Sequence, residues 1–93
     1  MNKNDILEIV KTEIIKWDPI DLLQLGAPLN EYDMEISLIT NRIEQGLDIK
    51  QIEYIIYKVF IYMFEESTFS DINKFKKECN NIATIIYNSL KLC

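Results

Sequence analysis

The apolar residues of this chain recur at three- and four-residue steps along almost its whole length, which is the period of an α-helix. The first such segment spans 5–17, and three more follow Asn30, Asp48 and Ser70. These three residues and Asn4 can each accept a hydrogen bond from the first turn of a helix, so we expect them to be the N-caps. No segment has the two-residue alternation of a half-buried strand, and the pattern therefore predicts four helices.

This pattern predicts an all-α fold, a small antiparallel four-helix assembly in which residues 1–93 form a single domain. The first connection is expected to contain a short extra helical turn. Asp18 and Pro19 have the residue types of an N-cap and a first helical position, and Gly26 can end the turn in a left-handed conformation. Gly46 is expected to end the second long helix in the same way.

The apolar stripes of the four segments are the expected core. The helix that begins after Asp48 is apolar almost all round, as expected of the central member of a bundle. Cys79 is expected to be a small core residue, and in one continuous helix it lies about 21 Å from Cys93, too far for a disulfide. The residues expected on the buried faces are Ile6, Leu7, Val10, Ile14, Trp17, Tyr32, Ile36, Ile39, Ile43, Ile49, Ile52, Ile55, Ile56, Val59, Phe60, Met63, Phe64, Ile72, Phe75, Cys79, Ile82, Ile86 and Leu90.

All of the excess charge lies in one stretch. Between Lys16 and Arg42 there is no cation, and the carboxylates in this gap equal the formal net charge of −5. The gap also holds both prolines and the only tryptophan, so an acidic, turn-rich segment interrupts an otherwise plain helical chain. Such a segment is where a partner is expected to dock, and a basic protein is the electrostatically favoured partner. The negative charge argues against nucleic acid and against an anionic membrane surface.

The sequence lacks the residues of most catalytic and metal sites. It contains no histidine, its two cysteines have no histidine to complete a zinc site or a nucleophilic pair, and its two glycines form no phosphate-binding loop. The acidic residues also lack the glycine that a calcium loop needs for its sharp turn, since Ile36 follows Glu31, Asp33 and Glu35. We therefore expect no enzyme activity, no catalytic, metal-binding or cofactor-binding residue, no cofactor and no small-molecule substrate.

The acidic stretch supports two interpretations. In the first, it is a partner-binding surface in which Met34 and Leu38, joined by Leu29 and Ile20, form the apolar centre inside an acidic rim. In the second, its carboxylates only cap helices or favour the helix dipole, and its apolar residues are ordinary surface scatter. The residues assigned to the partner-binding surface are Asp18, Asp21, Glu31, Asp33, Met34, Glu35 and Leu38.

Three short motifs carry a resemblance to a known family. They are Trp17-Asp18-Pro19-Ile20, Gly26-Ala27-Pro28 and Glu31-Tyr32-Asp33-Met34-Glu35-Ile36. Together they resemble the shared core of the small bacterial family catalogued as domain of unknown function 1871, and beyond residues 17–36 only the hydrophobic pattern agrees. The resemblance implies a small all-helical protein and transfers no catalytic residue. Similar Trp-Asp-Pro and Glu-Tyr-Asp cores occur in small proteins that resemble immunity proteins of bacterial toxin systems.

These observations predict a non-catalytic protein-binding module. Most concretely, we expect an immunity-type protein that binds and neutralises a basic toxin, such as a nuclease, through the acidic surface at 18–35. The alternative is a housekeeping structural or regulatory helical protein whose acidic connection only caps helices. The N-terminus lacks the apolar core and cleavage site of a signal peptide, and no apolar run reaches transmembrane length, so a cytoplasmic location is expected.

Overall fold

The computed structural model describes residues 2–44 and 46–91 and is all-α. Within these ranges there is no strand, and no helix combines the length and the apolar character needed to cross a lipid bilayer. The expectation that Cys93 forms no disulfide concerns a residue outside the described ranges. The helices are α1 (Lys3–Trp17), α2 (Asp33–Arg42), α3 (Ile49–Phe64), the short 3₁₀-helix η1 (Glu66–Thr68) and α4 (Ile72–Lys91).

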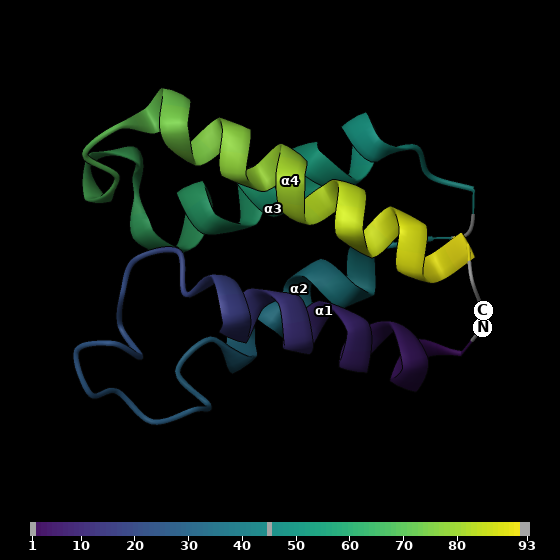
Figure 1. Ribbon diagram of the computed structural model, residues 1–93, viewed down its shortest axis with the longest axis horizontal. Helices are drawn as coiled ribbons and strands as arrows, with labels where there is room; N and C mark the ends of the chain where they lie inside the picture. The colour runs from purple at the N-terminus through teal and green to yellow at the C-terminus, as the bar shows by residue number, and fades with distance from the viewer. Residues whose placement is uncertain (1, 45, 92–93) are drawn as a thin grey trace.

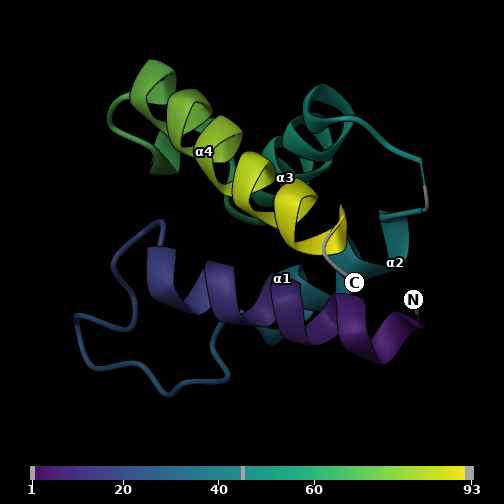
Figure 2. The ribbon, with the colours of Figure 1, turned by 45° about the vertical axis from the view of Figure 1, so that its right-hand side comes forward.

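The four α-helices form an up-and-down bundle of two layers (Figure 1). α1 and α2 lie in one layer, α3 and α4 lie in the other, and each helix runs antiparallel to the one before it. Packing of α1 against α4 and of α2 against α3 closes the bundle. The long connection from 18 to 32 projects from the end of the bundle that also carries the connection between α3 and α4, as both views show (Figures 1 and 2). This end of the molecule is therefore where residues distant in the sequence can meet.

The prediction that the third long helix is the central member of the bundle is wrong. α3 packs against α2 and α4 but keeps an outer side in contact with solvent. Tyr54 and Tyr62 on that side are 62% and 82% exposed. In a closed bundle of four helices each helix has two main neighbours, so one side of each remains on the surface even where the sequence there is apolar.

Side-chain caps start α1 and α4 at positions other than those predicted. Asn2 rather than Asn4 caps α1, and Asp71 rather than Ser70 caps α4. In each case the side-chain Oδ1 accepts a hydrogen bond from the backbone N–H three residues further on, at 2.9 and 3.1 Å. The apolar period locates a helix only to within a few residues, whereas a cap must stand directly before the first turn, and the two predictions fail for that reason.

The start of α3 confirms its predicted cap. Asp48 Oδ1 accepts from the N–H of Gln51 at 2.8 Å, and the Gln51 side chain accepts from the N–H of Asp48 at 2.8 Å, which completes a capping box. The start of α2 differs from the prediction. Tyr32 stands at the N-cap position without a side-chain cap, and the Asn30 carbonyl oxygen accepts from the N–H of Asp33 at 3.1 Å. α2 thus begins with a backbone turn rather than with an Asn30 cap.

α2 ends earlier than predicted, and a side chain from another helix donates hydrogen bonds to the carbonyl groups at its end. It stops at Arg42, and Gly46 lies in the following connection with a φ of +94°. The Lys3 ammonium at the start of α1 donates to the carbonyl oxygens of Thr40 (2.9 Å) and Ile43 (3.3 Å). A cation is favourable at a helix C-terminus and satisfies carbonyl oxygens that have no partner inside the helix.

The first connection contains the predicted extra turn in reduced form. Residues 22–25 make one hydrogen-bonded turn, which is too short to be a helix. The N–H groups of Gly26 and Ala27 donate to the carbonyl oxygens of Leu23 (3.1 Å) and Leu22 (2.9 Å), the pairing that ends a helix in a Schellman motif. Gly26 has a φ of +104°, which confirms its predicted role as the left-handed stop.

The predicted apolar stripes form the core. Several residues expected in it lie at its margin and are only partly buried: Leu7, Trp17, Ile49, Ile55, Met63, Phe64, Ile72 and Leu90. The fully or almost fully buried apolar residues are Ile6, Val10, Ile14, Tyr32, Ile36, Ile39, Ile43, Ile52, Ile56, Val59, Phe60, Phe75, Cys79, Ile82, Ala83 and Ile86. Cys79 is the small core residue that the pattern predicted, and burial raises the pKa of its thiol well above the ordinary range.

Phe60 on α3 is the centre of an aromatic cluster at the end of the bundle that carries the first connection. Its side chain is fully buried, and its ring centroid lies 5.7 Å from that of Trp17, 6.1 Å from those of Tyr32 and Phe75, and 6.0 Å from that of Phe64. These neighbours come from α1, the residue before α2, α4 and α3 itself. One ring therefore joins all four helices, and aromatic pairs at such distances are favourable beyond their buried area.

We expect Phe60→Ala to lower the free energy of unfolding by about 3–5 kcal/mol, because it removes a large buried side chain and leaves a cavity that the neighbouring rings cannot fill. For a domain of this size that loss is comparable with the whole stability. Tyr62→Ala, two positions along the same helix and 82% exposed, is the matched control and should change stability little. Urea unfolding followed by circular dichroism measures both. Equal stability of the two variants would contradict the central role of Phe60.

Candidate functional site

Asp18 ends α1 and organises the connection that follows. Its backbone is left-handed (φ +48°), and its N–H donates to the carbonyl oxygen of Ile14 at 2.9 Å. Its carboxylate accepts the N–H groups of Leu23 (3.1 Å) and Gln24 (3.0 Å), which belong to the short turn. The predicted capping role is therefore present, but Asp18 acts across five and six residues. Pro19 does not open the turn of residues 22–25 as predicted, because it lies in a separate turn in which the Asp21 N–H donates to the Asp18 carbonyl oxygen at 3.0 Å.

Asp18 is also bound from the other end of the connection. The hydroxyl of Tyr32, whose side chain is fully buried, donates to Asp18 Oδ1 at 2.6 Å and accepts from the N–H of Ile20 at 3.4 Å. Partial burial raises the pKa of Asp18, but the hydrogen bonds from Tyr32, Leu23 and Gln24 together outweigh it and hold the pKa below its ordinary value. Burial and the bond to Asp18 raise the pKa of Tyr32.

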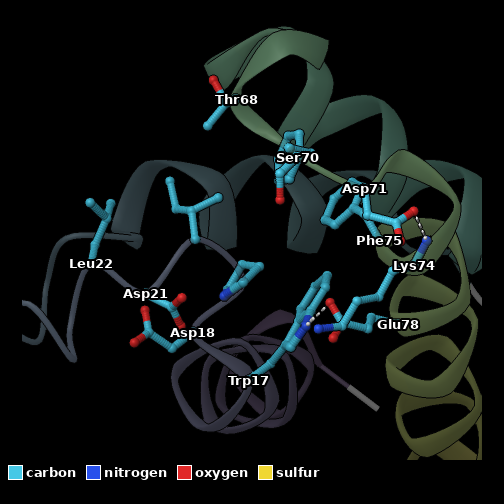
Figure 3. A pocket seen from close by; sticks show the side chains of 13 residues that line it. Trp17, Asp18, Asp21, Leu22, Thr68, Ser70, Asp71, Lys74, Phe75 and Glu78 are labelled. Carbon is cyan, nitrogen blue, oxygen red and sulfur yellow. Dashed lines mark hydrogen bonds between the residues drawn. The ribbon is translucent and has the colours of Figure 1, made fainter.

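A hollow of about 410 Å³ lies between the start of this connection and the start of α4 (Figure 3). We call it the acidic hollow. One side is the connection, and the other side is the segment that links α3 to α4 together with the first two turns of α4. Its lining residues are Trp17, Asp18, Pro19, Ile20, Asp21, Leu22, Thr68, Phe69, Ser70, Asp71, Lys74, Phe75 and Glu78.

Carboxylates surround the acidic hollow on both sides. In Figure 3, Asp18 and Asp21 lie on one side of it, and Asp71 and Glu78 lie on the other. Lys74 is the one cation in the lining. Asp21 is exposed and has a left-handed backbone (φ +58°), a conformation that Asp tolerates better than most residues. The hollow therefore carries a negative potential into which a cation would be drawn.

An aromatic wall lies between these carboxylates. The Trp17 ring stacks on Phe75 with centroids 5.6 Å apart, and Phe69 stacks on the same Phe75 ring at 4.0 Å. The Trp17 indole N–H donates to Glu78 Oε1 at 3.3 Å, which fixes the indole against α4. Trp17 is half-buried rather than fully buried, so part of its surface belongs to the hollow and not to the core.

The residues predicted for partner binding do not all line one hollow. Asp18 and Asp21 line the acidic hollow, whereas Leu38 lines a separate groove between α2 and α3. The predicted apolar patch of Met34, Leu38, Leu29 and Ile20 has no common hollow: Ile20 lines the acidic one, and Leu29 and Met34 are 71% and 63% exposed outside both. The remaining exposed residues of the prediction, which lie at the start of α2 outside the hollow, are Glu31, Asp33 and Met34.

Glu35 was placed in the predicted acidic surface but is buried. It is 3% exposed, and its Oε1 has no hydrogen-bond partner among the described residues. Burial raises the pKa of Glu35, and the charges of Glu31 and Asp33 raise it further. Because Glu35 stands one helical turn before the buried Ile39, it shares the inner side of α2. Its charge therefore does not face a partner.

Asp71, Glu78 and Phe69 belong to the acidic hollow but were not predicted as site residues. They lie 51 to 60 residues after Asp18 in the sequence, and the packing of α1 against α4 brings them to it. No local pattern in the sequence connects the two segments. One feature of the sequence could have indicated this contact. Trp17 ends the apolar stripe of the first helix, and its large ring needs a packing partner at that end of the bundle.

The site offers no metal-binding group of side chains. Comparison with known proteins assigns no family or function to the chain. In the ranges that the structure describes, no three Cys, Asp or Glu side chains converge closely enough to hold a metal ion. No protein-family model, curated protein or solved structure matches the chain. The resemblance to the family of domain of unknown function 1871 and to immunity proteins stays a prediction.

We expect Tyr32→Phe to lower the free energy of unfolding by about 1.5–3 kcal/mol at pH 7, because it removes a hydrogen bond to a charged carboxylate and keeps the ring. The folded-state pKa of Asp18 is lowered, so its stabilisation is present above the ordinary pKa of 3.8 and is lost as the pH falls through the folded-state pKa. The penalty should therefore shrink at acid pH. Urea unfolding at pH 7 and pH 2.5 measures it, with the exposed Tyr54→Phe as control; an unchanged penalty contradicts the role of the charge.

Glu35→Gln should stabilise the protein at pH 7. The folded-state pKa of Glu35 is raised, so the cost of ionising a buried carboxyl is present above that pKa and disappears as the pH falls towards the ordinary value of 4.5. The gain from Glu35→Gln should therefore be largest at neutral pH and vanish in acid. Glu8→Gln, at an exposed position whose charge does not contribute to the pKa shift of Glu35, is the control. Thermal unfolding across this pH range measures the effect, and a loss of stability at pH 7 would refute it.

Proposed function

We propose that this protein is a non-catalytic protein-binding module whose acidic hollow receives a lysine or arginine side chain of a basic protein partner. The observation that carries the proposal is the placement of the Asp21, Asp71 and Glu78 carboxylates around the half-buried Trp17 ring. Such a combination offers a cation both charge-assisted hydrogen bonds and an aromatic surface.

The carboxylates of the hollow are open to a partner's cation. Among residues 2–44 and 46–91, the only ion pair joins Lys50 to Glu53, and neither of these residues lines the hollow. Asp18 differs from its neighbours because both of its oxygens accept hydrogen bonds from the connection. Asp18 therefore contributes negative charge and fixes the conformation of the connection. Asp21, Asp71 and Glu78 would make the contacts with the partner's cation.

The size and lining of the hollow suit a long basic side chain. Its volume of about 410 Å³ is larger than one side chain, so a neighbouring residue of the partner also fits. The methylene groups of Lys or Arg would lie against Trp17 and Phe69 while the charged end reaches the carboxylates. The net charge of −5 would add long-range attraction and speed association with a basic surface.

The more specific form of the proposal is an immunity-type protein that covers the positive surface of a toxin. A nuclease toxin is a suitable target, because a surface that binds phosphates presents cations. The support is the acidic hollow together with the resemblance of the motifs in residues 17–36. If the reading frame next to this one encodes a large secreted protein with a variable C-terminus, the C-terminal domain of that protein is the partner to test.

One observation favours a second candidate, a structural or regulatory helical protein. The most interconnected carboxylate of the acidic stretch, Asp18, is fully used within the fold, and Glu35 is buried. Two of the five carboxylates between Lys16 and Arg42 are thus explained by the structure itself. The two candidates predict different effects of removing charge from the hollow. The first predicts weaker binding of a basic partner, and the second predicts no change in binding.

Changing Asp21 to Asn, Asp71 to Asn and Glu78 to Gln removes three charges from the hollow and leaves its hydrogen-bond acceptors in place. Asn at 71 can still cap α4, and Gln at 78 can still accept from the Trp17 N–H, so we expect the fold to persist. Binding to a basic peptide of alternating Arg and Gly should weaken by about tenfold, mainly through slower association. Trp17 is the only tryptophan, so its fluorescence reports binding at the hollow.

The matched control changes the exposed Asp5 to Asn and the exposed Glu8 and Glu44 to Gln, which alters the net charge equally at positions outside the hollow. The control should bind nearly as the unmodified protein does, and added salt should weaken that binding. If the two triple variants bind alike, or if salt has no effect, the acidic hollow is not the binding site and the structural candidate is favoured.

A further inference from the structure

A second hollow surface lies between α2 and α3 and shares no lining residue with the acidic hollow. We call it the α2–α3 groove; its volume is about 470 Å³. Leu38 from α2 and Ile55 and Val59 from α3 form its apolar floor. Val59 is nearly buried and the other two are partly exposed, so the floor is continuous with the core but open to solvent.

Two rows of side chains border the groove. Tyr54, Lys58 and Tyr62 follow one another at four-residue steps along α3 and share one side of that helix. Leu38 and Arg42 stand at the same spacing on α2. Tyr54 and Tyr62 are 62% and 82% exposed, so both rings are accessible to a partner at the border of the groove.

The charge of the groove is opposite to that of the molecule as a whole. Arg42 and Lys58 are its only charged lining residues, and no carboxylate lines it, although the chain has a net charge of −5. The Arg42 guanidinium donates to the Leu38 carbonyl oxygen at 3.1 Å, and the Lys58 ammonium lies over the Tyr54 ring, 5.7 Å from its centroid. Both cations are thus held at the edge of the apolar floor.

We propose that the α2–α3 groove binds an amphipathic helix of a partner protein, one with apolar side chains on the docking face and Asp or Glu beside them. A helix fits because the bordering rows repeat at four-residue steps, and a third helix can place its own ridges between them. Acidic flanks fit because Arg42 and Lys58 would each meet a carboxylate.

A second copy of this chain fits the groove less well. In a symmetric pair formed through this surface, each copy presents the same patch, so Arg42 and Lys58 would face the same cations across the interface. The resulting repulsion disfavours such a dimer. The groove therefore has a charge preference opposite to that of the acidic hollow, and the protein could hold two different partners at once.

The test uses three synthetic peptides of about 15 residues, each acetylated and amidated at its ends. The first is a helix with leucines on one face and glutamates beside them, the second has lysines in place of the glutamates, and the third is the first with its residues permuted to remove the apolar face. We expect the first to shift the amide resonances of Leu38, Arg42, Lys58 and Tyr62 in the ¹⁵N-labelled protein. The other two should bind about tenfold more weakly.

Charge reversal supplies the second arm of the test. Arg42→Glu combined with Lys58→Glu should reverse the preference, so that the lysine peptide binds better than the glutamate peptide. Lys11→Glu combined with Lys77→Glu changes the net charge equally at exposed positions outside the groove and should leave the preference unchanged. If the groove variant does not fold, Tyr62→Ser, at an exposed position, should weaken the glutamate peptide several-fold instead.

Three results would overturn the proposal. The first is equal binding of the glutamate and lysine peptides, and the second is a set of shifted resonances that lies away from α2 and α3. The third is a concentration-dependent dimer in sedimentation velocity that the Arg42→Glu and Lys58→Glu changes abolish, because the occupant would then be a second copy of the chain. Unchanged Trp17 fluorescence during the peptide titration would support binding at the groove rather than at the acidic hollow.

Discussion

The hydrogen bond between Tyr32 and Asp18 joins the parts of this structure that depend most on one another. The Asp18 backbone ends α1, its carboxylate caps the following turn, and the same carboxylate accepts from a buried Tyr32 hydroxyl at the start of α2. The Tyr32 ring packs against Phe60, the centre of the aromatic cluster. One charged group is therefore connected to a helix end, to a long connection and to the core. Because the hydrogen bond is charge-assisted, it is strong enough to define the path of a segment that has little regular structure.

The path of that segment decides which acidic residues meet solvent and which do not. With Asp18 held by three donors, the chain turns at Asp21 in a left-handed conformation and leaves that side chain exposed beside α4. The helix that follows then carries Glu35 into the interior. The formal charge of the chain is concentrated between Lys16 and Arg42, but the negative surface is shared between this stretch and the start of α4, where Asp71 and Glu78 lie. The cations of the α2–α3 groove stand apart from it.

Most of the fold could be predicted from the sequence because it depends on local interactions. The period of the apolar residues placed four helices, and the Asp48 cap and the Gly26 stop were correct, since each is set by a few adjacent residues. The contact of Lys3 with the carbonyl groups at the end of α2 was not predictable in this way, because Lys3 belongs to a different helix. The prediction that Glu35 belongs to the exposed acidic surface is wrong for a related reason. A charged residue type favours exposure, but the packing of α2 buries this side chain.

The sequence by itself determined the helices, the buried stripe that contains Tyr32, and the position of the acidic, turn-rich segment. Only the tertiary structure decided that this segment faces residues 68–78, and that Leu38 belongs to a groove with Tyr62 rather than to an apolar patch with Ile20. The physical reason is the range of the interactions. Periodicity and capping act over three or four residues, whereas both candidate surfaces form where helices far apart in the sequence pack side by side.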